Sequence, residues 1–496
     1  MSLLPKRKTK IICTIGPVSQ SPDVLERMVR SGMDVARLNL AHGDLDSHQA
    51  AIARVRAAAA GVGRRVALMA DLPGPKLRVG TIEGGRFELT RGQDVRLVAG
   101  QGMDFGDSSA IAADAVGESR MKDDIPVVPL PLPSLPAALR PGKEIFLNDG
   151  LIELRLVDDV HDDVVMARVV VGGELRSHDG ASLPGIDLGI SAFTERDREL
   201  LAFALDEGAD AVAVSFVQGP DDVLSVRDAA RSLGHSPLLV AKIERSKAVE
   251  RIDDILEVSD GLMVARGDLG VEIPVERVAV VQKSLIGRAN AAARPVITAT
   301  QMLESMTHNR RPTRAEVSDV SNAVLDGTDC VMLSEETAMG MFPVEAVSVM
   351  AAVTSTTERY LNTTHRPPAD ATSIRGVLAQ ETAVTAERLD ARYILVPTET
   401  GTTARAVAKL RPRSWVIALS GDEKICQQLQ FSRGVYPVLV PKAGIHPDGA
   451  VCGEIDWHAV VRRWMAAQKL EPGLAVMIQG NNRLEVVELD GAPVPD

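Results

Sequence analysis

Aromatic residues are scarce in this sequence, which contains 8 Phe, 3 Tyr and 3 Trp among 496 residues. Its cores must therefore be filled by aliphatic side chains, and a hydrophobic content of 45% is normal for a folded globular protein. The chain also lacks an excess of basic residues, because 55 Lys and Arg face 67 Asp and Glu, for a formal net charge of −12. This charge argues against a protein that binds nucleic acid, whose binding surface should be basic.

Cysteine is equally rare. Cys13, Cys330, Cys426 and Cys452 lie far apart and form no Cys-x-x-Cys pair, so we expect reduced thiols in a cytoplasmic protein. No apolar run is long enough to span a membrane, and no membrane partner is expected. The start, MSLLPKRKTKIICTIGP, has too short an apolar part for a signal peptide and is more typical of a strand.

Short β-rich runs alternate with amphipathic segments along much of the chain. Strands are predicted at TKIICTIG, DVARLNL, RVALMAD, DAVAVSFV, LLVAKIE, GLMVARGD, PVITATQ and DCVMLSE. Strands that alternate with helices indicate a parallel sheet. Eight of them fit a closed (β/α)8 TIM barrel better than an open sheet, so the predicted class is α/β.

The chain is too long for a single core, and two breaks in the pattern predict its domains. Residues 74–186 are rich in Gly and Pro and carry short alternating strands, which predicts an inserted β-rich lid domain beside the C-terminal face of the barrel. The barrel would then comprise residues 1–73 and 187–355. The alternation restarts in YILVPTETGTTARAVAKLRPRSWVIALS, which predicts a C-terminal α/β domain over residues 356–496.

Polar residues gather where predicted barrel strands end, which is the face that carries the active site in such barrels. Lys242 and Glu244 share one face of a strand, although a buried pair that only closes the barrel would look the same. Asp268 ends the next predicted strand, and two neighbouring carboxylates need a cation between them. Mg²⁺ that holds a phosphate suits this ligand set. Gly267 permits close approach of the backbone, although a Gly-Asp turn that caps a helix is an alternative.

Other strand ends carry further candidates. Thr300 ends the seventh predicted strand, although threonine is common in strands. Arg37 and Asn39 share a face of the second strand, where either a phosphate or a salt bridge to Asp71 would satisfy the arginine. Together these groups predict a phosphorylated substrate, a divalent metal, a lysine that acts in catalysis and a lid, as phosphoryl transfer requires. The sequence has no Walker loop and no HRD or DFG motif, so a nucleotide must be bound in another way.

These motifs resemble those of the pyruvate kinase family. KTKIICTIGP, GMDVARLN, LLVAKIE, DGLMVARGDLGVEIP, PVITATQMLESM, RPTRAEVSDVSNAVLDGTDCVMLS and ETAMG follow in family order and cover nearly the whole chain. The resemblance implies transfer of the phosphoryl group from phosphoenolpyruvate to ADP, giving pyruvate and ATP. It also implies Mg²⁺, or Mn²⁺ in its place, and a homotetramer.

The resemblance further implies roles for individual residues. Lys242 would be catalytic beside the transferring phosphoryl group and the developing enolate, Arg37 would clamp the phosphoryl group, and Glu244 and Asp268 would hold the metal. The substrate carboxylate would be seated by Gly267, Asp268 and Thr300, and the last proton would arrive through water near Thr300 and Ser334. The residues expected toward the nucleotide are Asn39, His42, Arg78 and the lid residue Asp149.

Two departures from the family's usual pattern concern anionic groups. Glu335 stands where a Gly is usual, and we expect it to point to solvent. The segment TETGTTAR (398–405) resembles a loop that binds the phosphate of an effector, with a Thr where an Arg is often found. The terminal MIQGNNRLEVVEL lacks the longer Gly-rich loop of members that fructose-1,6-bisphosphate activates, so a monophosphate is expected. The effector loop residues are Thr398, Thr400, Gly401, Thr402 and Thr403.

A third departure concerns K⁺. In potassium-dependent members an Asn, a Ser, an Asp-Thr pair and a nearby Glu define the ion's site. Here Asn39 and Asp71 remain, but Ala41 and Leu72 offer no side-chain oxygen, and Lys76 replaces the Glu. We expect Lys76, held by a Pro-Gly-Pro turn, to supply the missing positive charge near Asp71 and the substrate phosphate. The chain would then resemble the potassium-independent bacterial group, although a surface lysine at the lid hinge is the alternative.

Two other functions remain open on the sequence. Another barrel enzyme that acts on phosphoenolpyruvate or pyruvate, such as a mutase or an aldolase, shares paired metal carboxylates, but it would not need the lid together with VAKIE. A catalytically weak paralogue kept for regulation or binding is supported only by Glu335. The intact Lys242, Glu244 and Asp268 oppose it.

Overall fold

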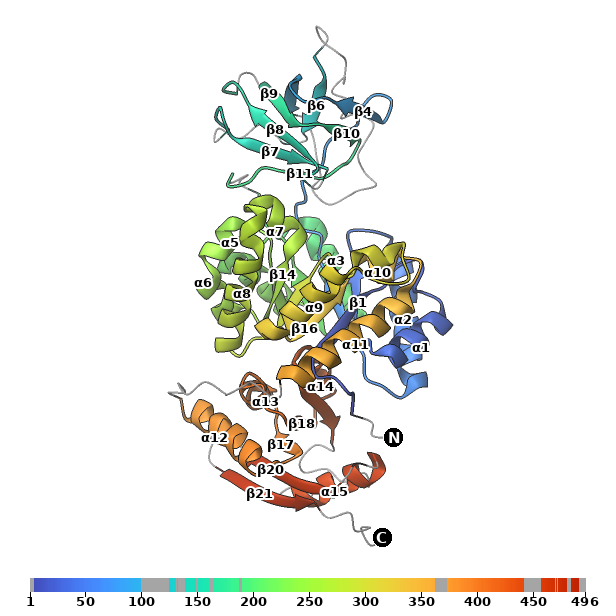
Figure 1. Cartoon of the computed structure of the whole chain (residues 1–496), viewed down its shortest axis with the longest axis vertical. Coiled ribbons are helices and arrows are strands. Elements are labelled where there is room, and N and C mark those ends of the chain that lie inside the picture. Colours follow the sequence, from blue (N-terminus) through green and yellow to red (C-terminus); the bar gives the residue numbers. More distant parts are fainter. Residues whose placement is uncertain are drawn as a thin grey trace.

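The computed structural model describes residues 4–99, 125–130, 132, 139–148, 150–160, 164–186, 190–361, 373–440, 456–468, 470, 472–479 and 483–489. Three parts follow one another along the long axis of the molecule: a β-rich lid at one end, a barrel in the middle and an α/β domain at the other end (Figure 1). Within these ranges, no helix combines the length and the apolar character that crossing a membrane requires.

Eight parallel strands close into the central barrel, as predicted, and each pairs with its neighbour in the same direction. They are β1 (Lys10–Thr14), β2 (Val35–Asn39), β3 (Ala67–Asp71), β12 (Ala211–Val214), β13 (Leu238–Ile243), β14 (Gly261–Ala265), β15 (Val296–Ala299) and β16 (Cys330–Leu333). Several end earlier than we expected. In GLMVARGD the strand stops at Ala265, and Arg266 already begins a helix.

Helices surround the barrel, and local sequence fixes their ends. Ser21 caps the first helix, and Thr313 and Glu316 form a reciprocal capping box at the start of α9. The barrel helices are α1 (Pro22–Ser31), α2 (Leu45–Val62), α3 (Glu195–Asp206), α4 (Pro220–Ser232), α5 (Ser246–Glu250), α6 (Ile252–Val258), α7 (Arg266–Glu272), α8 (Val275–Ala291), α9 (Arg314–Asp326), α10 (Glu335–Ala338) and α11 (Pro343–Leu361), with a 3-10 turn at η1 (Glu304–Thr307).

Aliphatic side chains fill the barrel, as the shortage of aromatic residues requires. One layer of Ile, Val, Leu, Met and Ala side chains lies between the barrel strands and the surrounding helices, and a second layer fills the interior of the barrel. Phe431 belongs to this inner layer although it comes from the C-terminal domain. The thiols of Cys13, Cys330 and Cys426 are buried and free, as expected, while Cys452 lies outside the described residues.

The lid leaves the barrel after β3 and returns before α3, and it encloses an apolar core of its own. It contains a pair, β4 (Arg86–Leu89) with β10 (Gly173–Arg176), and a six-stranded sheet in the order β11 (Ala181–Ser182), β7 (Glu144–Leu147), β8 (Ile152–Leu156), β9 (Val164–Val171), β5 (Asp94–Ala99) and β6 (Val127–Leu130). The lid lies over α7, where Ser182 Oγ donates to Glu272 Oε1 at 3.2 Å. It therefore faces the C-terminal ends of the barrel strands.

The C-terminal domain lies at the opposite end of the barrel (Figure 1). Its sheet has the order β19 (Val435–Leu439), β18 (Trp415–Ser420), β17 (Tyr393–Pro397), β20 (Gly473–Gln479) and β21 (Arg483–Leu489), with β21 antiparallel. Its helices are α12 (Ile374–Arg388), α13 (Thr402–Ala408), α14 (Glu423–Gln428), η2 (Leu429–Phe431) and α15 (Trp457–Gln468). The domain borders at 73/74, 186/187 and 355/356 stay predictions, and the last of them falls within α11.

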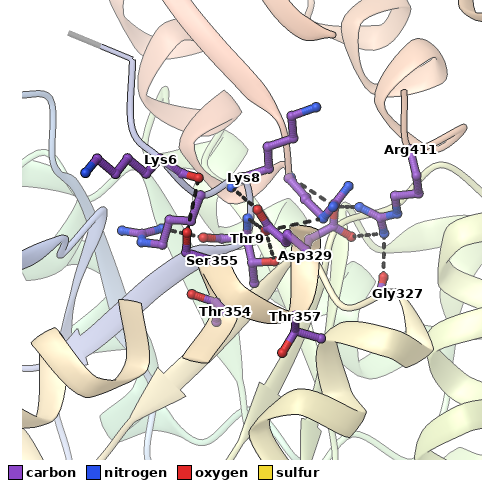
Figure 2. A network of polar contacts seen from close by, with 12 residues as sticks. Lys6, Lys8, Thr9, Gly327, Asp329, Thr354, Ser355, Thr357 and Arg411 are labelled. Carbon is purple, nitrogen blue, oxygen red and sulfur yellow. Dashed lines mark hydrogen bonds and ion pairs between the residues drawn. The ribbon is translucent and has the colours of Figure 1, made fainter. Parts of the chain in front are cut away.

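Buried charges join this domain to the barrel (Figure 2). Arg411, from the loop after α13, pairs with Asp329 at the start of β16, with Nη1 and Oδ1 2.8 Å apart, and also donates to Gly327 O. The same Asp329 oxygen accepts the backbone N–H of Arg433 at 3.0 Å. Because one carboxylate receives donors from two loops of the C-terminal domain, it fixes that domain's position at the bottom of the barrel.

The segment before β1 enters the same joint. Lys8 Nζ donates to Pro412 O at 2.8 Å and to Ser414 O at 3.0 Å, and burial together with Arg433 lowers the pKa of Lys8 to about 7. Glu358 of α11 accepts the backbone N–H of Lys8 at 2.7 Å and lies 3.7 Å from Arg433 Nε. Glu358 therefore balances cations from both sides of the joint.

We expect Glu358→Gln to destabilise the protein by about 3 kcal/mol, because it leaves Arg433 buried without its counter-charge. The matched control is Glu345→Gln on the same helix. The partner of Glu345, Arg310, is 74% exposed, so this substitution should change the free energy of unfolding by less than about 0.5 kcal/mol. Urea unfolding of both variants measures the difference. Equal, small effects would show that Glu358 does not hold the joint together.

Candidate active site

A buried chain of charges lies at the C-terminal end of the barrel. Lys242 of β13 places Nζ 2.9 Å from Glu244 Oε1 and 3.2 Å from Asp71 Oδ1, and it donates to Ser215 Oγ at 2.6 Å. Burial lowers the pKa of Lys242, but Asp71 and Glu244 outweigh burial and hold that pKa above its ordinary value. The two carboxylates therefore favour the protonated lysine at this position.

Asp71, at the end of β3, receives a second cation. Arg37 Nε donates to Asp71 Oδ2 at 2.7 Å, and Arg37 Nη1 donates to Thr14 Oγ1 at 2.9 Å. Burial alone would raise the pKa of Asp71, but Lys242 and Arg37 lower it. Of the two partners that the sequence left open for Arg37, the structure shows the salt bridge, and this salt bridge holds the guanidinium at the barrel mouth.

Glu244 and Asp268 form the predicted pair of carboxylates. Glu244 follows β13, and its Oε2 accepts the Phe216 N–H at 2.7 Å. Burial raises the pKa of Glu244 and, although Lys242 opposes this, the negative charge of Asp268 raises it further. Asp268 lies in the first turn of α7 rather than at the end of a strand, which corrects our expectation. Its side chain is 39% exposed, so one end of the pair is open.

The carboxylate pair fits a divalent ion that keeps most of its own water. Among the residues that the structure describes, no three His, Cys, Asp or Glu side chains gather as a full protein cage would require. Two carboxylates that repel each other beside an open cavity suit Mg²⁺, which is commonly held by one or two carboxylates plus substrate phosphates. Glu244 and Asp268 could therefore hold the ion, with water and substrate as the remaining ligands.

The lid supplies one wall of this site. A cavity of about 30 Å³ is lined by Glu244 and Asp268 of the barrel, by Lys76 of the segment that leads into the lid, and by Phe146, Gly150 and Ser182 of the lid. It adjoins a larger cavity of about 240 Å³ at the base of the lid. A small anion could thus be enclosed between the two parts, which would strengthen electrostatic contacts by excluding water.

Thr300 stands beside the first turn of α7. The Gly267 N–H donates to Thr300 Oγ1 at 2.8 Å, and that hydroxyl donates to Ala299 O at 2.6 Å. We expected Thr300 within a strand, but β15 ends at Ala299, and Thr300 adopts a left-handed φ of 65°. A φ of this kind costs roughly 1–3 kcal/mol in a residue with a Cβ, so the neighbouring structure must impose it.

Cations gather where the nucleotide is expected. His42 lies at the surface, and partial desolvation together with Arg78, Lys76 and Arg37 lowers its pKa. Arg78 Nη1 donates to His178 O of the lid at 3.0 Å, while Asn39 Oδ1 accepts the Ala41 N–H at 3.3 Å. Such a group of positive charges suits the phosphates of a nucleotide. The fourth predicted residue, Asp149, lies outside the described residues.

Lys76 faces the pair of carboxylates. Its Nζ lies 3.8 Å from Asp268 Oδ1. We expected it near Asp71, whose charge Arg37 and Lys242 already balance, and that expectation stays a prediction. The turn before it is fixed, because the Gly74 N–H donates to Asp197 Oδ1 at 3.0 Å. Leu72 is 2% exposed and brings no oxygen to this corner.

Three residues at the mouth of the barrel escaped the sequence analysis. Ser215 and Phe216 follow β12, where Ser215 accepts from Lys242 and Phe216, at a φ of 55°, aims its N–H at Glu244. Arg266 precedes Gly267. The alternating pattern of DAVAVSFV gave no sign of a left-handed residue at its end, and nothing in VARGDLG set Arg266 apart.

The loop after β16 agrees with expectation. Glu335 is exposed, and Glu336 turns inward, where its carboxylate accepts the N–H groups of Leu303 at 2.9 Å and of Ser334 at 2.7 Å. The Ser334 hydroxyl is buried, and no described residue provides it with a hydrogen-bond partner. An orphaned buried hydroxyl of this kind is a place for a bound water.

Comparison with known proteins now adds to this geometry. Residues 6–347 match the family model "Pyruvate kinase, barrel domain", and residues 377–482 match "Pyruvate kinase, alpha/beta domain". The chain is 44% identical to a pyruvate kinase of Thermococcus litoralis over 88% of its own length and 89% of that protein. It is 43% identical to one of Geobacillus stearothermophilus over 88% of its length and 72% of that protein.

A solved structure agrees across the whole chain. The crystal structure of a pyruvate kinase from Cryptosporidium parvum superimposes with a TM-score of 0.84 at 32% identity, covering 98% of this chain and 97% of that one. These matches leave no reason to keep a mutase or an aldolase as the alternative. The chain belongs to the pyruvate kinase family of phosphotransferases.

Proposed function

We propose that this chain transfers the phosphoryl group of phosphoenolpyruvate to ADP at the C-terminal face of the barrel, with Lys242 as the central catalytic residue. The observation that carries the proposal is the position of the Lys242 ammonium group, which is only 12% exposed and lies 3.2 Å from Asp71 Oδ1 and 2.9 Å from Glu244 Oε1, two anions that favour its protonated form. A lysine that stays protonated cannot act as a base. It instead holds positive charge in place for the phosphoryl oxygens and the enolate oxygen, where negative charge grows as the P–O bond breaks.

Two neighbours prepare the phosphoryl group. Arg37, which Asp71 and Thr14 orient, binds the phosphoryl oxygens through its planar fork. Glu244 and Asp268 would hold Mg²⁺, or Mn²⁺ in its place, and the ion would neutralise charge on the phosphoryl oxygens. Burial raises the pKa of Glu244 and the negative charge of Asp268 raises it further, which supports a cation between the two carboxylates.

The other end of the substrate is an anion too. Gly267, Asp268 and Thr300 seat its carboxylate, and the contact of 2.8 Å between the Gly267 N–H and Thr300 Oγ1 supports a shared binding site. After transfer, the enolate accepts a proton at its terminal carbon to become pyruvate. Water between Thr300 and the orphaned hydroxyl of Ser334 delivers that proton.

ADP, which accepts the phosphoryl group, enters the site from the side of His42. Asn39, His42 and Arg78 lie toward the nucleotide, and the cations that depress the pKa of His42 support a phosphate site there. Asp149, predicted to approach from the lid, completes this set as a proposal from the sequence alone.

We expect Lys242→Met to lower kcat by about 10²–10³-fold, because a charge placed for the transition state is lost. The KM for phosphoenolpyruvate should change far less. A coupled assay with phosphoenolpyruvate, ADP and Mg²⁺ measures both constants. Lys6→Met is the matched control, because this lysine is exposed and precedes β1, at the end of the barrel opposite the site. A kcat near that of the unaltered protein would remove Lys242 from the mechanism.

We propose further that no K⁺ is needed, as in the potassium-independent bacterial group. A hard cation leaves water only for oxygen ligands, and Ala41 and buried Leu72 supply none. Lys76 brings a positive charge to the same corner, where its ammonium group is 3.8 Å from Asp268. The fixed Pro-Gly-Pro turn limits the entropy lost in holding it there.

Full activity is therefore expected in buffer that contains Mg²⁺ but no K⁺, with a tetraalkylammonium salt keeping ionic strength constant. Lys76→Glu should depress activity, and K⁺ should restore it only when Ala41→Ser and Leu72→Thr supply the missing oxygens. The measurement is rate against K⁺ concentration. Activation of the unaltered protein by tenfold or more, an effect of about 1.4 kcal/mol, would contradict the proposal.

The C-terminal domain is proposed to bind a phosphorylated effector at the loop before α13. Thr398 Oγ1 accepts the Gly401 N–H at 2.9 Å, and the hydroxyls of Thr400 and Thr402 lie 2.8 Å apart. Arg405, one turn later, donates from Nη1 to Thr400 O at 3.3 Å and brings the cation that position 402 lacks. These four residues, with Gly401 and Thr403, form a small site. Only residues 480–482 connect β20 to β21, so a second phosphate has no long loop to bind it.

A nucleoside or sugar monophosphate should therefore activate the enzyme at low phosphoenolpyruvate concentration. Thr402→Val should weaken that activation and leave the rate at saturating substrate unchanged, because the loop lies at the far end of the barrel. Initial rates in the presence of each phosphate decide this. Strong activation by fructose-1,6-bisphosphate alone would speak against a monophosphate site.

The remaining proposals concern the setting of the enzyme. Buried free thiols at Cys13, Cys330 and Cys426 support a cytoplasmic location. A homotetramer is supported by exposed apolar side chains on α8, where Val275 and Val280 are 76% and 68% exposed and could meet another subunit.

A further inference from the structure

Two consecutive residues after β15 have left-handed backbones. Thr300 has a φ of 65° and Gln301 a φ of 51°. Left-handed conformations are rare for residues that carry a Cβ and rarest for β-branched ones such as threonine. A pair of them persists only where surrounding contacts determine the backbone completely.

Arg266 provides these contacts. As the first residue of α7, it sends its guanidinium group across to the end of β15. Its Nε donates to Ala299 O at 3.1 Å, and its Nη2 donates to Thr300 O at 2.7 Å and to Gln301 O at 3.3 Å. One planar group thus binds three successive carbonyl oxygens, which a lysine, with a single nitrogen, could not do in the same geometry.

The guanidinium group is anchored on its other side. Its Nη1 lies 2.6 Å from Asp319 Oδ2 of α9 and 3.3 Å from Gln282 Oε1 of α8. Gln282 is 2% exposed, and it donates in turn to Asp326 Oδ2 at 3.0 Å. Because two helices fix Arg266, the carbonyl groups that it binds are fixed as well.

We infer that Arg266 is a positioning residue, which imposes the left-handed turn and thereby holds the Thr300 hydroxyl against the Gly267 N–H. The inference rests on the proposed role of Thr300 in seating the substrate carboxylate and passing the last proton. Arg266, Gly267 and Asp268 are consecutive, so one helical turn carries the metal ligand, the carboxylate amide and the clamp that places the threonine.

Replacing the clamp should misplace the threonine without emptying the site. We expect Arg266→Met to lower kcat/KM for phosphoenolpyruvate by about 10- to 100-fold, the usual effect of a small misplacement of a reacting group. The KM for ADP should stay within about twofold, because the nucleotide side contacts other residues. Arg288→Met, an exposed arginine of α8 paired only with Asp253, is the control and should match the unaltered protein.

A double-variant cycle separates positioning from a general loss of structure. If Arg266 acts through Thr300, the pair Arg266→Met and Thr300→Ala should be no slower than Thr300→Ala alone by more than about twofold. Rescue gives a second readout. Adding Gln301→Gly to Arg266→Met should raise kcat/KM at least about threefold above that of Arg266→Met alone, because glycine adopts a left-handed φ without strain.

Asp319→Asn covers the case in which Arg266→Met does not fold. It leaves the guanidinium group in place but loosens its anchor, so kcat/KM for phosphoenolpyruvate should fall by about three- to tenfold, with the KM for ADP unchanged. Two outcomes would overturn the inference alone. One is a double variant in which the losses in kcat/KM of the two single variants multiply. The other is an Arg266→Met variant whose kcat/KM stays within twofold of that of the unaltered protein while that of Thr300→Ala is impaired. Normal kinetics of Thr300→Ala would overturn it together with the proposed role of Thr300.

Discussion

The buried pairing of Asp71 with two cations is the constraint on which the rest of the site depends. Asp71 is 1% exposed, and a carboxylate at such a position can stay charged only beside positive partners. Arg37 from β2 and Lys242 from β13 supply them, and they lie together only because the barrel closes. Lys242 in turn requires Glu244 close by. Charge balance therefore determines the direction of four side chains from three strands before any substrate is present.

The balance of buried charges does not extend to Asp268, whose partly exposed side chain forms the open side of the site. Lys242 balances both Asp71 and Glu244, and burial, together with the negative charge of Asp268, still raises the pKa of Glu244. The Phe216 N–H and the ammonium group of Lys76 bring partial compensation. A divalent cation between the two carboxylates would remove the remaining negative charge, and a phosphate bound to that cation would suit the neighbouring guanidinium groups of Arg37 and Arg78.

The sequence predicts the strands and those side chains that extended backbone can place. Alternation put Lys242 and Glu244 on one face, and the ion pair between them confirms it. Alternation fails where the backbone leaves the extended region. Asp268 lies on a helical turn, and Thr300 and Phe216 adopt left-handed conformations, none of which has a periodic signature. Long-range partners were equally hidden, because only the pairing of β14 with β15 brings Arg266 against the end of β15.

One strand connects the two ends of the barrel. β15 begins at Val296, whose N–H donates to Asp329 Oδ2 at 3.1 Å. It ends just before Thr300, whose carbonyl oxygen accepts from Arg266 Nη2. The same Asp329 is held by Arg411, which follows α13. Contact alone does not establish coupling between sites. The contacts do establish that β15 lies between two groups that arginines anchor, with Asp329, bound by Arg411, at its start and the turn bound by Arg266 at its end. The lower joint and the strained turn are therefore the two ends of one strand.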